Sequence, residues 1–386
     1  MAGRHLDRTD HGPDAAYVEP VTTHVEKVEE IVRQDAALLE EDLGAFLDAL
    51  TDGGESADVY AHALRGTLHE PAADALGSKA GQQALPPRPD APGGTAPLRP
   101  SMVYWAYRNY RGFSGEFAPD FAAIRRTAVA VRVLMKAAVA LDDIQDDSAI
   151  RYGEPALHVT HGVPVALNTG AWLITSALRH VGQPAATQAL LASVSRGFTG
   201  QAADLASRTD ATRASLLTAP HPDRVRFWES VAALKTGTLF RMPLEAALAA
   251  LGVQEDDRDT LDDAMRRLGL ASQLFNDLTD VVPEFGGANT HEDFAGLGNR
   301  VFLELLGTQP PPAGADLRTY VLGHPKLDQT LLQLSAEAVE LKRSAKEAVH
   351  SVCRSDLSAA YFDLTIDRKG HLIDRLHRTL TERSGA

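Results

Sequence analysis

The sequence lacks most features that mark secreted, membrane-spanning or disulfide-bonded proteins. It contains a single cysteine, Cys353, so no disulfide can form within the chain, which is typical of proteins in a reducing compartment. No segment approaches the ~18–20 apolar residues of a membrane span, and residues 1–20 contain no apolar signal core. We therefore expect a cytoplasmic protein without a stable membrane anchor.

An excess of positive charge is also missing. The formal net charge is −14, which argues against a nucleic-acid partner, because phosphate backbones attract basic surfaces. It argues equally against docking on an anionic membrane. An anionic small-molecule substrate remains compatible with this charge, provided that metal ions or a few local cations neutralise it.

Alternating strand patterns are scarce, whereas apolar residues recur every three or four positions along most of the chain. We predict an all-α protein with one helical domain over residues 21–386 and a disordered tail at residues 1–20, which could be a docking segment for another protein. Six prolines between residues 71 and 98 predict a mobile loop there. Expected helices cover 22–50, 55–68, 121–145, 164–180, 185–207, 223–251, 256–282, 294–306 and 335–383.

A cluster of aspartates ends one apolar helical segment. Asp142 and Asp146 are four residues apart and share a helix face, where like charges repel and burial makes the repulsion costlier. Asp143 lies beside them, and no lysine or arginine falls between residues 141 and 150. A divalent cation would offset the charge, and magnesium prefers oxygen ligands. The alternative is a solvated acidic helix end.

A second acidic cluster lies on another expected helix and contains Asn276, Asp277, Asp280 and Glu284. Their spacing of three and four residues would let them hold a metal from the opposite wall of a cavity. Pro283 disfavours helical conformation in the residue before it, so Glu284 could lie outside the helix. An ordinary acidic patch at a helix end is the alternative. Two such clusters on apolar helices are less easily explained by chance than one.

At this point the sequence resembles the trans-polyprenyl diphosphate synthase family, from about residue 98 to residue 284. Residues 142–146 look like its first DDxxD motif, and residues 276–280 stand where its second belongs. Further matches are Leu98-Arg99-Pro100, Arg151 to Pro155 with His158, Gly162 to Asn168, Gly200-Gln201 with Asp204-Leu205, and Lys235 to Gly237. The resemblance implies a helical bundle around a central apolar cavity, a homodimer, a prenyl diphosphate substrate and three Mg²⁺ ions.

The resemblance also assigns roles to individual residues. Metal ions would stabilise the leaving diphosphate as Lewis acids, cations would bind it, and water must be excluded from the allylic cation. The implied catalytic residues are Asp142, Asp146, Arg151 and Lys235; the implied diphosphate ligands are Arg99, Arg151, Lys235, Thr236 and Gln273; and the implied metal ligands are Asp142, Asp143, Asp146, Asn276, Asp277, Asp280 and Glu284.

Departures from the family pattern gather at the site for its second substrate, isopentenyl diphosphate. The family motif GGKRLRP supplies a lysine and two arginines, but here Ala96 and Pro97 replace two of them and only Arg99 remains. Met135 replaces a histidine, and Tyr152 replaces the second arginine after the DDxxD motif. Each charge-assisted hydrogen bond is worth ~1.5–3 kcal/mol, so a second diphosphate should bind poorly. Lys79, Lys136 or Arg108 could compensate.

The second motif departs in a similar direction. With Asn276 in place of the first aspartate, it resembles the NSE metal motif of class I terpene synthases, which use one allylic diphosphate. In the family, the residues four and five positions before the first motif form the floor of the hydrocarbon pocket. Here they are Ala137 and Ala138, with Leu134 a turn below, so we expect a substrate or product of twenty carbons or more. Alternatively, the alanines let two helices pack closely.

These observations favour a class I terpene synthase-like enzyme on a polyprenyl synthase scaffold, which ionises a long allylic prenyl diphosphate and cyclises or quenches it. A chain-elongating polyprenyl diphosphate synthase is the first alternative. An inactive partner subunit of a heteromeric prenyl synthase is the second.

Overall fold

The computed structural model describes residues 24–51, 59–77, 98–114, 119–151, 153–282, 285, 296–306 and 316–384. The expected disordered tail, most of the expected loop at 71–98, Lys79 and Glu284 lie outside these ranges. No described helix has the length and apolarity needed to cross a membrane.

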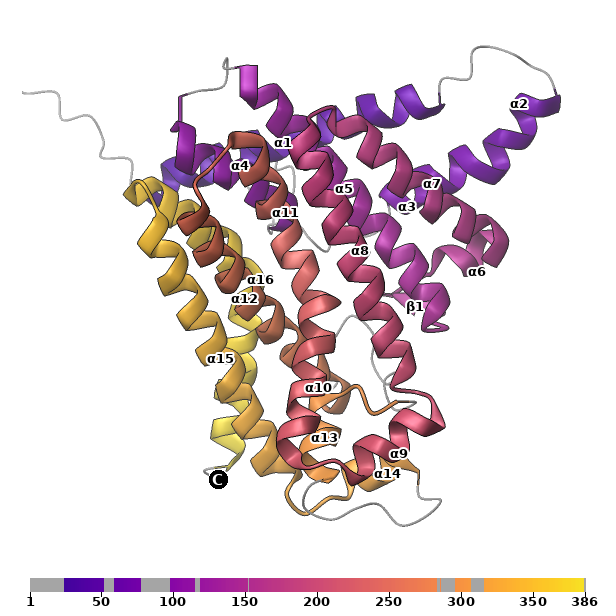
Figure 1. The fold of residues 1–386 in the computed structure, drawn as a ribbon, viewed down its shortest axis with the longest axis vertical. Coiled ribbons are helices and arrows are strands. Elements are labelled where there is room, and N and C mark those ends of the chain that lie inside the picture. Colours follow the sequence, from indigo (N-terminus) through magenta and orange to yellow (C-terminus); the bar gives the residue numbers. More distant parts are fainter. Residues whose placement is uncertain are drawn as a thin grey trace, which may run out of the picture.

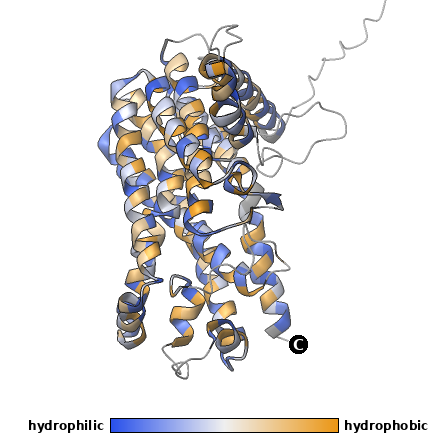
Figure 2. Cartoon of the chain, turned by 90° about the vertical axis from the view of Figure 1, so that its right-hand side faces the viewer, coloured by the Kyte–Doolittle hydropathy of each residue, from blue (hydrophilic) through white to orange (hydrophobic). Residues whose placement is uncertain are grey.

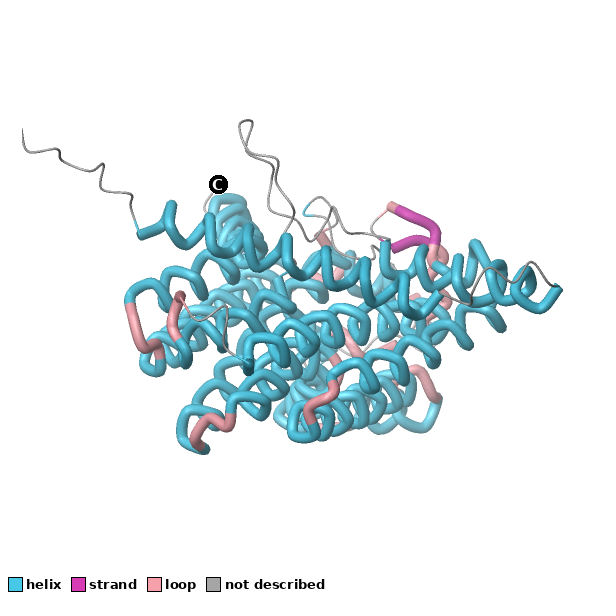
Figure 3. The backbone as a smooth tube through the Cα atoms, turned by 90° about the horizontal axis from the view of Figure 1, so that it is seen from above, coloured by secondary structure: helices cyan, strands magenta, loops and turns pink. Residues whose placement is uncertain are grey.

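The described part of the chain is almost entirely helical, as the all-α prediction requires (Figures 1 and 3). The one sheet it contains is a two-residue antiparallel pair, in which Ile150 pairs with Pro155. The elements are α1 His24–Thr51, α2 Val59–Leu64, the π-helical η1 Arg65–His69, α3 Glu70–Gly77, α4 Leu98–Arg111, α5 Pro119–Gln145, β1 Ile150–Arg151, β2 Glu154–Pro155, α6 Leu157–His161, α7 Val163–Val181, α8 Pro184–Ala206, α9 Asp210–Thr218, α10 His221–Leu234, α11 Thr236–Leu251, α12 Glu255–Val281, α13 Arg300–Leu306, α14 Leu317–Leu322, α15 Leu327–Val352 and α16 Asp356–Ser384.

Helix α11 lies at the centre of the bundle and packs against α4, α5, α8 and α12. Helix α7 covers α5, and α15 covers α12 and contacts α16 in turn. The long helices run roughly along the longest axis of the molecule, while α9, α10, α13 and α14 gather at its lower end (Figure 1). Apolar and polar residues alternate along each helix (Figure 2), as expected of helices that each bury one face.

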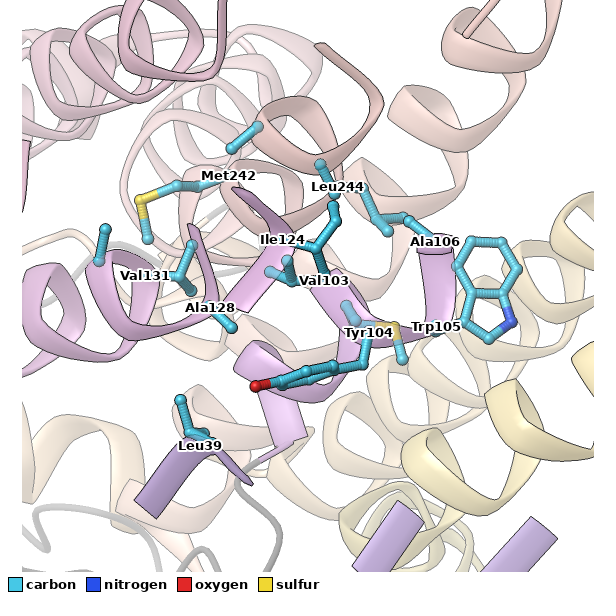
Figure 4. Close-up of a cluster of buried hydrophobic side chains, with 14 of the residues drawn as sticks. Leu39, Val103, Tyr104, Trp105, Ala106, Ile124, Ala128, Val131, Met242 and Leu244 are labelled. Carbon is cyan, nitrogen blue, oxygen red and sulfur yellow. The ribbon is translucent and has the colours of Figure 1, made fainter. Parts of the chain in front are cut away.

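The upper part of the bundle is held by an apolar core in which α1, α4, α5 and α11 meet. Leu39, Ile124, Val131 and Leu244 belong to it, together with Trp105, which lies at one edge of the cluster in Figure 4. All five side chains are buried, and Trp105 and Ile124 have no exposed surface. Burying one such side chain contributes ~1.5–3 kcal/mol, so this cluster accounts for much of the attachment of α1 to the bundle.

A buried ion pair crosses the same core. Arg108 Nη2 on α4 donates to Asp35 Oδ1 on α1 at 2.6 Å, and the Tyr361 hydroxyl on α16 donates to Asp35 Oδ2 at 3.1 Å. Arg108 and Asp35 are each 1% exposed. Arg108 is therefore committed to Asp35 and does not supply the missing charge of a second diphosphate site.

Four sequence-based boundaries were wrong. Residues 70–77 form α3 rather than a loop, because Pro71 stands in the first turn of a helix, where proline is tolerated. The expected helix at 223–251 is divided at Lys235, whose φ and ψ are −79° and −83°. The expected helix at 335–383 is divided at residues 353–355, and residues 296–299 are not helical although 294–306 was expected to be.

The close crossing of α11 and α12 generates a stability prediction. A Cβ atom built on Gly269 would lie 2.4 Å from the Gly237 Cα, whereas a Cβ on Gly44 in α1 meets no atom within 4 Å. We expect Gly269→Ala to destabilise the fold by about 1–3 kcal/mol through overpacking. The matched Gly44→Ala should be stabilising by roughly 0.5–1 kcal/mol, as expected for a helix interior. Urea denaturation followed by circular dichroism measures both; equal midpoints would contradict the close crossing.

Candidate functional site

The first aspartate cluster occupies the last turn of α5, and the β1–β2 hairpin folds back onto it. Arg151 in β1 donates through Nη2 to Asp142 Oδ2 at 2.8 Å and through Nε to Asp143 Oδ1. Asp143 is 1% exposed, so its carboxylate faces Arg151 rather than solvent. The chain leaves the helix at Asp147, whose φ of 55° is left-handed, a conformation that aspartate tolerates better than most residues.

Two further cations reach the cluster from distant parts of the chain. Lys235 Nζ, at the break between α10 and α11, lies 2.7 Å from Asp204 Oδ2, 3.2 Å from Asp142 Oδ1 and 3.5 Å from Asp146 Oδ2. Arg208 Nη2, just beyond α8, lies 2.7 Å from Asp146 Oδ1. The sequence predicts a divalent cation as the simplest way to offset these aspartates, and the tertiary structure adds arginine and lysine beside them.

These contacts set the ionisation of the cluster. Burial opposes the charge of Asp142, but the positive charges of Lys235 and Arg151 outweigh it and lower the pKa of that carboxyl. Burial and the neighbouring charge of Asp142 raise the pKa of Asp146 to about 6. Burial also opposes the charge of Lys235, yet the surrounding carboxylates raise its pKa well above the usual value. At neutral pH the cluster therefore consists of ionised carboxylates and a charged lysine, which attract ligands of opposite charge.

A glycine in the GQ motif makes the position of Lys235 possible. A Cβ atom on Gly200 would lie 2.5 Å from the Lys235 backbone nitrogen, so only glycine lets α8 approach the α10–α11 break this closely. The neighbouring Gln201 donates to Asp146 Oδ1 at 3.5 Å. The two motifs thus meet in space and carry Asp204 and Lys235 to the end of α5.

The second cluster lies near the C-terminal end of α12 and is held mainly by neutral donors. Asp277 Oδ2 accepts from Trp228 Nε1 at 2.7 Å and from the Arg300 backbone nitrogen at 2.8 Å. Its Oδ1 accepts from Gln273 Nε2 at 2.8 Å. Asn299 Nδ2 donates to Asp280 Oδ2 at 3.1 Å. Asp277 and Asp280 are both buried, so the helix end is tied to α10 and to the segment before α13.

The remaining predicted site residues lie around these clusters. The Thr236 hydroxyl donates to Gln273 Oε1, which joins the start of α11 to α12. Asn276 is partly exposed on α12. The Arg99 guanidinium stacks over the Phe240 ring, 4.8 Å from its centroid. Lys136, considered as a compensating cation, is 6% exposed on α5. The assignment of each to a ligand remains a prediction.

A small cavity of about 50 Å³ is lined by residues that contact the two clusters. Its lining includes Asp204, Arg208 and Lys235 from the first cluster's surroundings. It also includes Trp228, Gln273 and Asn299 from those of the second. Sequence reasoning missed Arg208, Trp228 and Asn299. Arg208 follows the DL signature by three residues and could have been noticed there, whereas nothing in the sequence marks the other two.

The predicted pocket floor is closely packed on one side. Ala137 has no exposed surface and Leu134 is 3% exposed, while Ala138 is partly exposed. A Cβ atom on Gly170 in α7 would lie 3.5 Å from the Ala137 carbonyl oxygen. Close packing of α5 on α7 therefore accounts for Ala137, and a link between these alanines and chain length remains a prediction.

The donor set suits a hard divalent ion, although no site is ready-made. Asp142 and Asp146 offer carboxylate oxygens on side chains that are 21% and 13% exposed. Within the described ranges, no three carboxylate, histidine or cysteine side chains are grouped closely enough to hold a metal. Magnesium usually binds one or two carboxylates and completes its shell with water and substrate phosphates, which fits this arrangement.

Comparisons with known proteins agree with the motifs. A sequence model described as polyprenyl synthetase matches residues 91–295. Fusoxypene synthase of Fusarium oxysporum is 28% identical over 264 residues, which is 66% of this chain and 33% of that protein. Geranylgeranyl pyrophosphate synthase of Dictyostelium discoideum is 28% identical over 155 residues, or 39% of this chain and 47% of that protein. The chain thus spans between a third and a half of the length of these relatives.

A solved structure shows the same fold. The polyprenyl synthase from Caulobacter crescentus, complexed with calcium and isoprenyl diphosphate, superposes with a TM-score of 0.59 at 23% sequence identity, and the match covers 90% of this chain and 98% of that one. The likeness confirms the all-α fold of this synthase group for the present chain.

The hydrogen bond between Trp228 and Asp277 generates a second prediction. Trp228→Phe keeps the ring but removes the indole donor from a buried carboxylate, which should cost about 1.5–3 kcal/mol. Trp172→Phe is the matched control, because Trp172 is partly buried and stacks on His69 at 6.4 Å. Thermal denaturation should show a clearly lower midpoint for the first variant. Equal losses would mean that the hydrogen bond does not stabilise the helix end.

Proposed function

Because this chain belongs to the polyprenyl synthetase family, we propose that it ionises an allylic prenyl diphosphate of twenty carbons or more and cyclises or quenches the resulting cation. The observation that carries this proposal is the convergence of Arg151, Arg208 and Lys235 on Asp142 and Asp146. A site of alternating carboxylates and cations suits metal ions and a diphosphate together, because each partner can exchange one ionic contact for another.

The chain's own residues have distinct parts in the proposed reaction. Asp142 and Asp146 would hold Mg²⁺, which acts as a Lewis acid on the leaving diphosphate. Arg151, Arg208 and Lys235 would donate to phosphate oxygens of the substrate when Asp142 and Asp146 bind metal instead of these cations. Three ions, with further ligands at Asn276, Asp277, Asp280 and Glu284, follow the family pattern.

Asp143 is assigned a different part from its neighbours. Its buried contact with Arg151 suits a residue that orients the arginine better than one that binds a metal. Trp228 and Asn299 would similarly fix Asp277 and Asp280 on the opposite wall. The apolar helices behind both clusters would exclude water from the allylic cation.

Cyclisation is favoured over elongation by the cations that are missing. A second diphosphate would find Ala96, Pro97, Met135 and Tyr152 where the family places basic residues or histidine. Arg108, which could have compensated, is buried against Asp35. The relative named fusoxypene synthase supports the same reading.

Elongation with isopentenyl diphosphate is the alternative, and the relative named geranylgeranyl pyrophosphate synthase supports it. An inactive partner subunit is a weaker candidate, because the charged residues of the allylic site are retained. We also propose that the chain acts in the cytoplasm as a homodimer.

A product analysis decides between cyclisation and elongation. The protein is incubated with Mg²⁺ and farnesyl, geranylgeranyl or farnesylgeranyl diphosphate, with and without isopentenyl diphosphate. We expect diphosphate release and a hydrocarbon or alcohol without isopentenyl diphosphate. A longer prenyl diphosphate that forms only when isopentenyl diphosphate is added would overturn cyclisation in favour of elongation. EDTA should abolish either activity.

The metal assignment predicts a contrast between Asp142 of the first motif and Asp147, which lies just beyond it. Asp142→Asn removes a carboxylate in contact with Arg151 and Lys235, whereas Asp147→Asn removes an exposed one beyond the helix. We expect the first to lower diphosphate release by at least ~10²-fold, as loss of one preorganised electrostatic group does, and the second to stay within about twofold. Full activity of the Asp142 variant would disprove the metal site.

Arg208 predicts two effects of opposite sign. Arg208→Gln removes a competitor for Asp146, so calorimetry should show tighter Mg²⁺ binding in the absence of substrate. The same variant should weaken binding of inorganic diphosphate in the presence of Mg²⁺ by roughly 10-fold or more, since a charged hydrogen bond is lost. Arg226→Gln, on the exposed face of α10, should change neither affinity. Weaker binding of Mg²⁺ alone would contradict the exchange of partners.

A further inference from the structure

A second concave site lies between α1, α5 and α7, away from the aspartates. It is a groove of about 540 Å³, within the range of small-molecule sites. We call it the arginine groove, because Arg125 and Arg126 of α5 and Arg179 of α7 line it. Asp42 also lines it, so three arginines face one carboxylate there, in a protein with a net charge of −14.

The three arginines differ in how many hydrogen-bond and ion-pair partners their guanidinium groups have. Arg125 is paired with Asp42 through two contacts of 2.7 Å. This hydrogen-bonded pair and the nearby charge of Glu41 raise the pKa of Arg125. Arg126 donates through Nε to the Val181 carbonyl oxygen at 3.1 Å, which fixes the plane of its guanidinium without neutralising it. Arg179 is exposed, and no hydrogen bond or ion pair of its guanidinium is found among the described residues.

Neutral donors stand between these cations. Ser176 is 8% exposed and His180 is half-buried, and both line the groove. Burial and the neighbouring charge of Arg126 lower the pKa of His180, so the ring offers a neutral nitrogen donor. Phe46 packs edge-on against His180, with ring centroids 4.9 Å apart, and gives the groove an apolar wall.

Helix capping alone does not account for this arrangement. Basic residues in the last turn of a helix complement its dipole, and this explains one arginine or histidine at the end of α7. Capping also accounts for the Nε–H of Arg126, which donates to Val181, the last residue of α7. It leaves the terminal nitrogens of Arg126 and the whole guanidinium of Arg179 without a hydrogen bond or ion pair among the described residues. Guanidinium groups bind phosphate through paired hydrogen bonds, and two of them with a hydroxyl and an imidazole make a suitable anion site.

We propose that the arginine groove binds a small phosphate- or diphosphate-bearing anion, with Arg126 and Arg179 as its charged ligands and the Phe46 side as its apolar wall. This site is separate from the aspartate clusters, and the inference does not depend on the proposed function. Free diphosphate and a prenyl diphosphate share the required chemistry. They differ in whether the apolar wall contributes.

The experiment is calorimetric titration of the full chain in EDTA with inorganic diphosphate, and separately with geranyl diphosphate. Arg179→Glu should weaken binding of both at least tenfold, and Arg179→Ala should weaken it by less. Arg226→Glu is the matched control, because it makes the same charge change on an exposed helical arginine; its side chain is 75% exposed. It should leave affinity within twofold.

Tighter binding of geranyl diphosphate than of inorganic diphosphate would show that the apolar wall is used, and equal affinities would identify the phosphate groups alone as the ligand. Either result supports the site if Arg179→Glu weakens the binding of both ligands at least tenfold. Absence of binding by the unaltered protein, or an equal loss in Arg179→Glu and Arg226→Glu, would overturn the proposal. Circular dichroism confirms that each variant is folded.

Discussion

Two partly buried carboxylates one helical turn apart repel each other unless positive charge lies against them. Here Asp142 and Asp146 receive it from three segments that are far apart in sequence: the hairpin after α5, the end of α8 and the break between α10 and α11. The arrangement of the central helices follows from this requirement, because α8 and α11 must both approach the end of α5. The same contacts suit the metal and diphosphate site that we propose, because each ligand can replace one ionic partner with another.

Glycines at the crossing points allow these helices to come close together, because glycine has no side chain. Gly200 lets α8 touch the Lys235 backbone, and Gly237 lets α12 cross α11 at Gly269. The second wall is then fixed by neutral hydrogen bonds, since Trp228 and Asn299 hold Asp277 and Asp280 without adding charge. The first wall therefore consists of ion pairs, whereas neutral hydrogen bonds orient the carboxylates of the second.

The fold itself does not decide between elongation and cyclisation. A solved polyprenyl synthase superposes on nearly the whole chain, while the relatives of similar sequence carry the names of both kinds of enzyme. Function resides in the site rather than in the scaffold. The difference that we propose here is a small number of charges. The cations that we assign to the allylic diphosphate are present, whereas Arg108, which could have joined a second set, pairs with Asp35 and holds α1 to α4.

The sequence alone determined the helical class, most helix boundaries within a few residues, and the identity of both acidic clusters, because periodicity and short motifs are local properties of the chain. It did not reveal the break at Lys235, the helical character of residues 70–77, or the parts of Arg208, Trp228 and Asn299. Those depend on which helices meet, and a residue's partner across the bundle leaves no local pattern. The charge that balances Asp142 and Asp146 is the clearest case: Arg151 follows them closely in the sequence, but only tertiary packing brings Lys235 and Arg208 within reach.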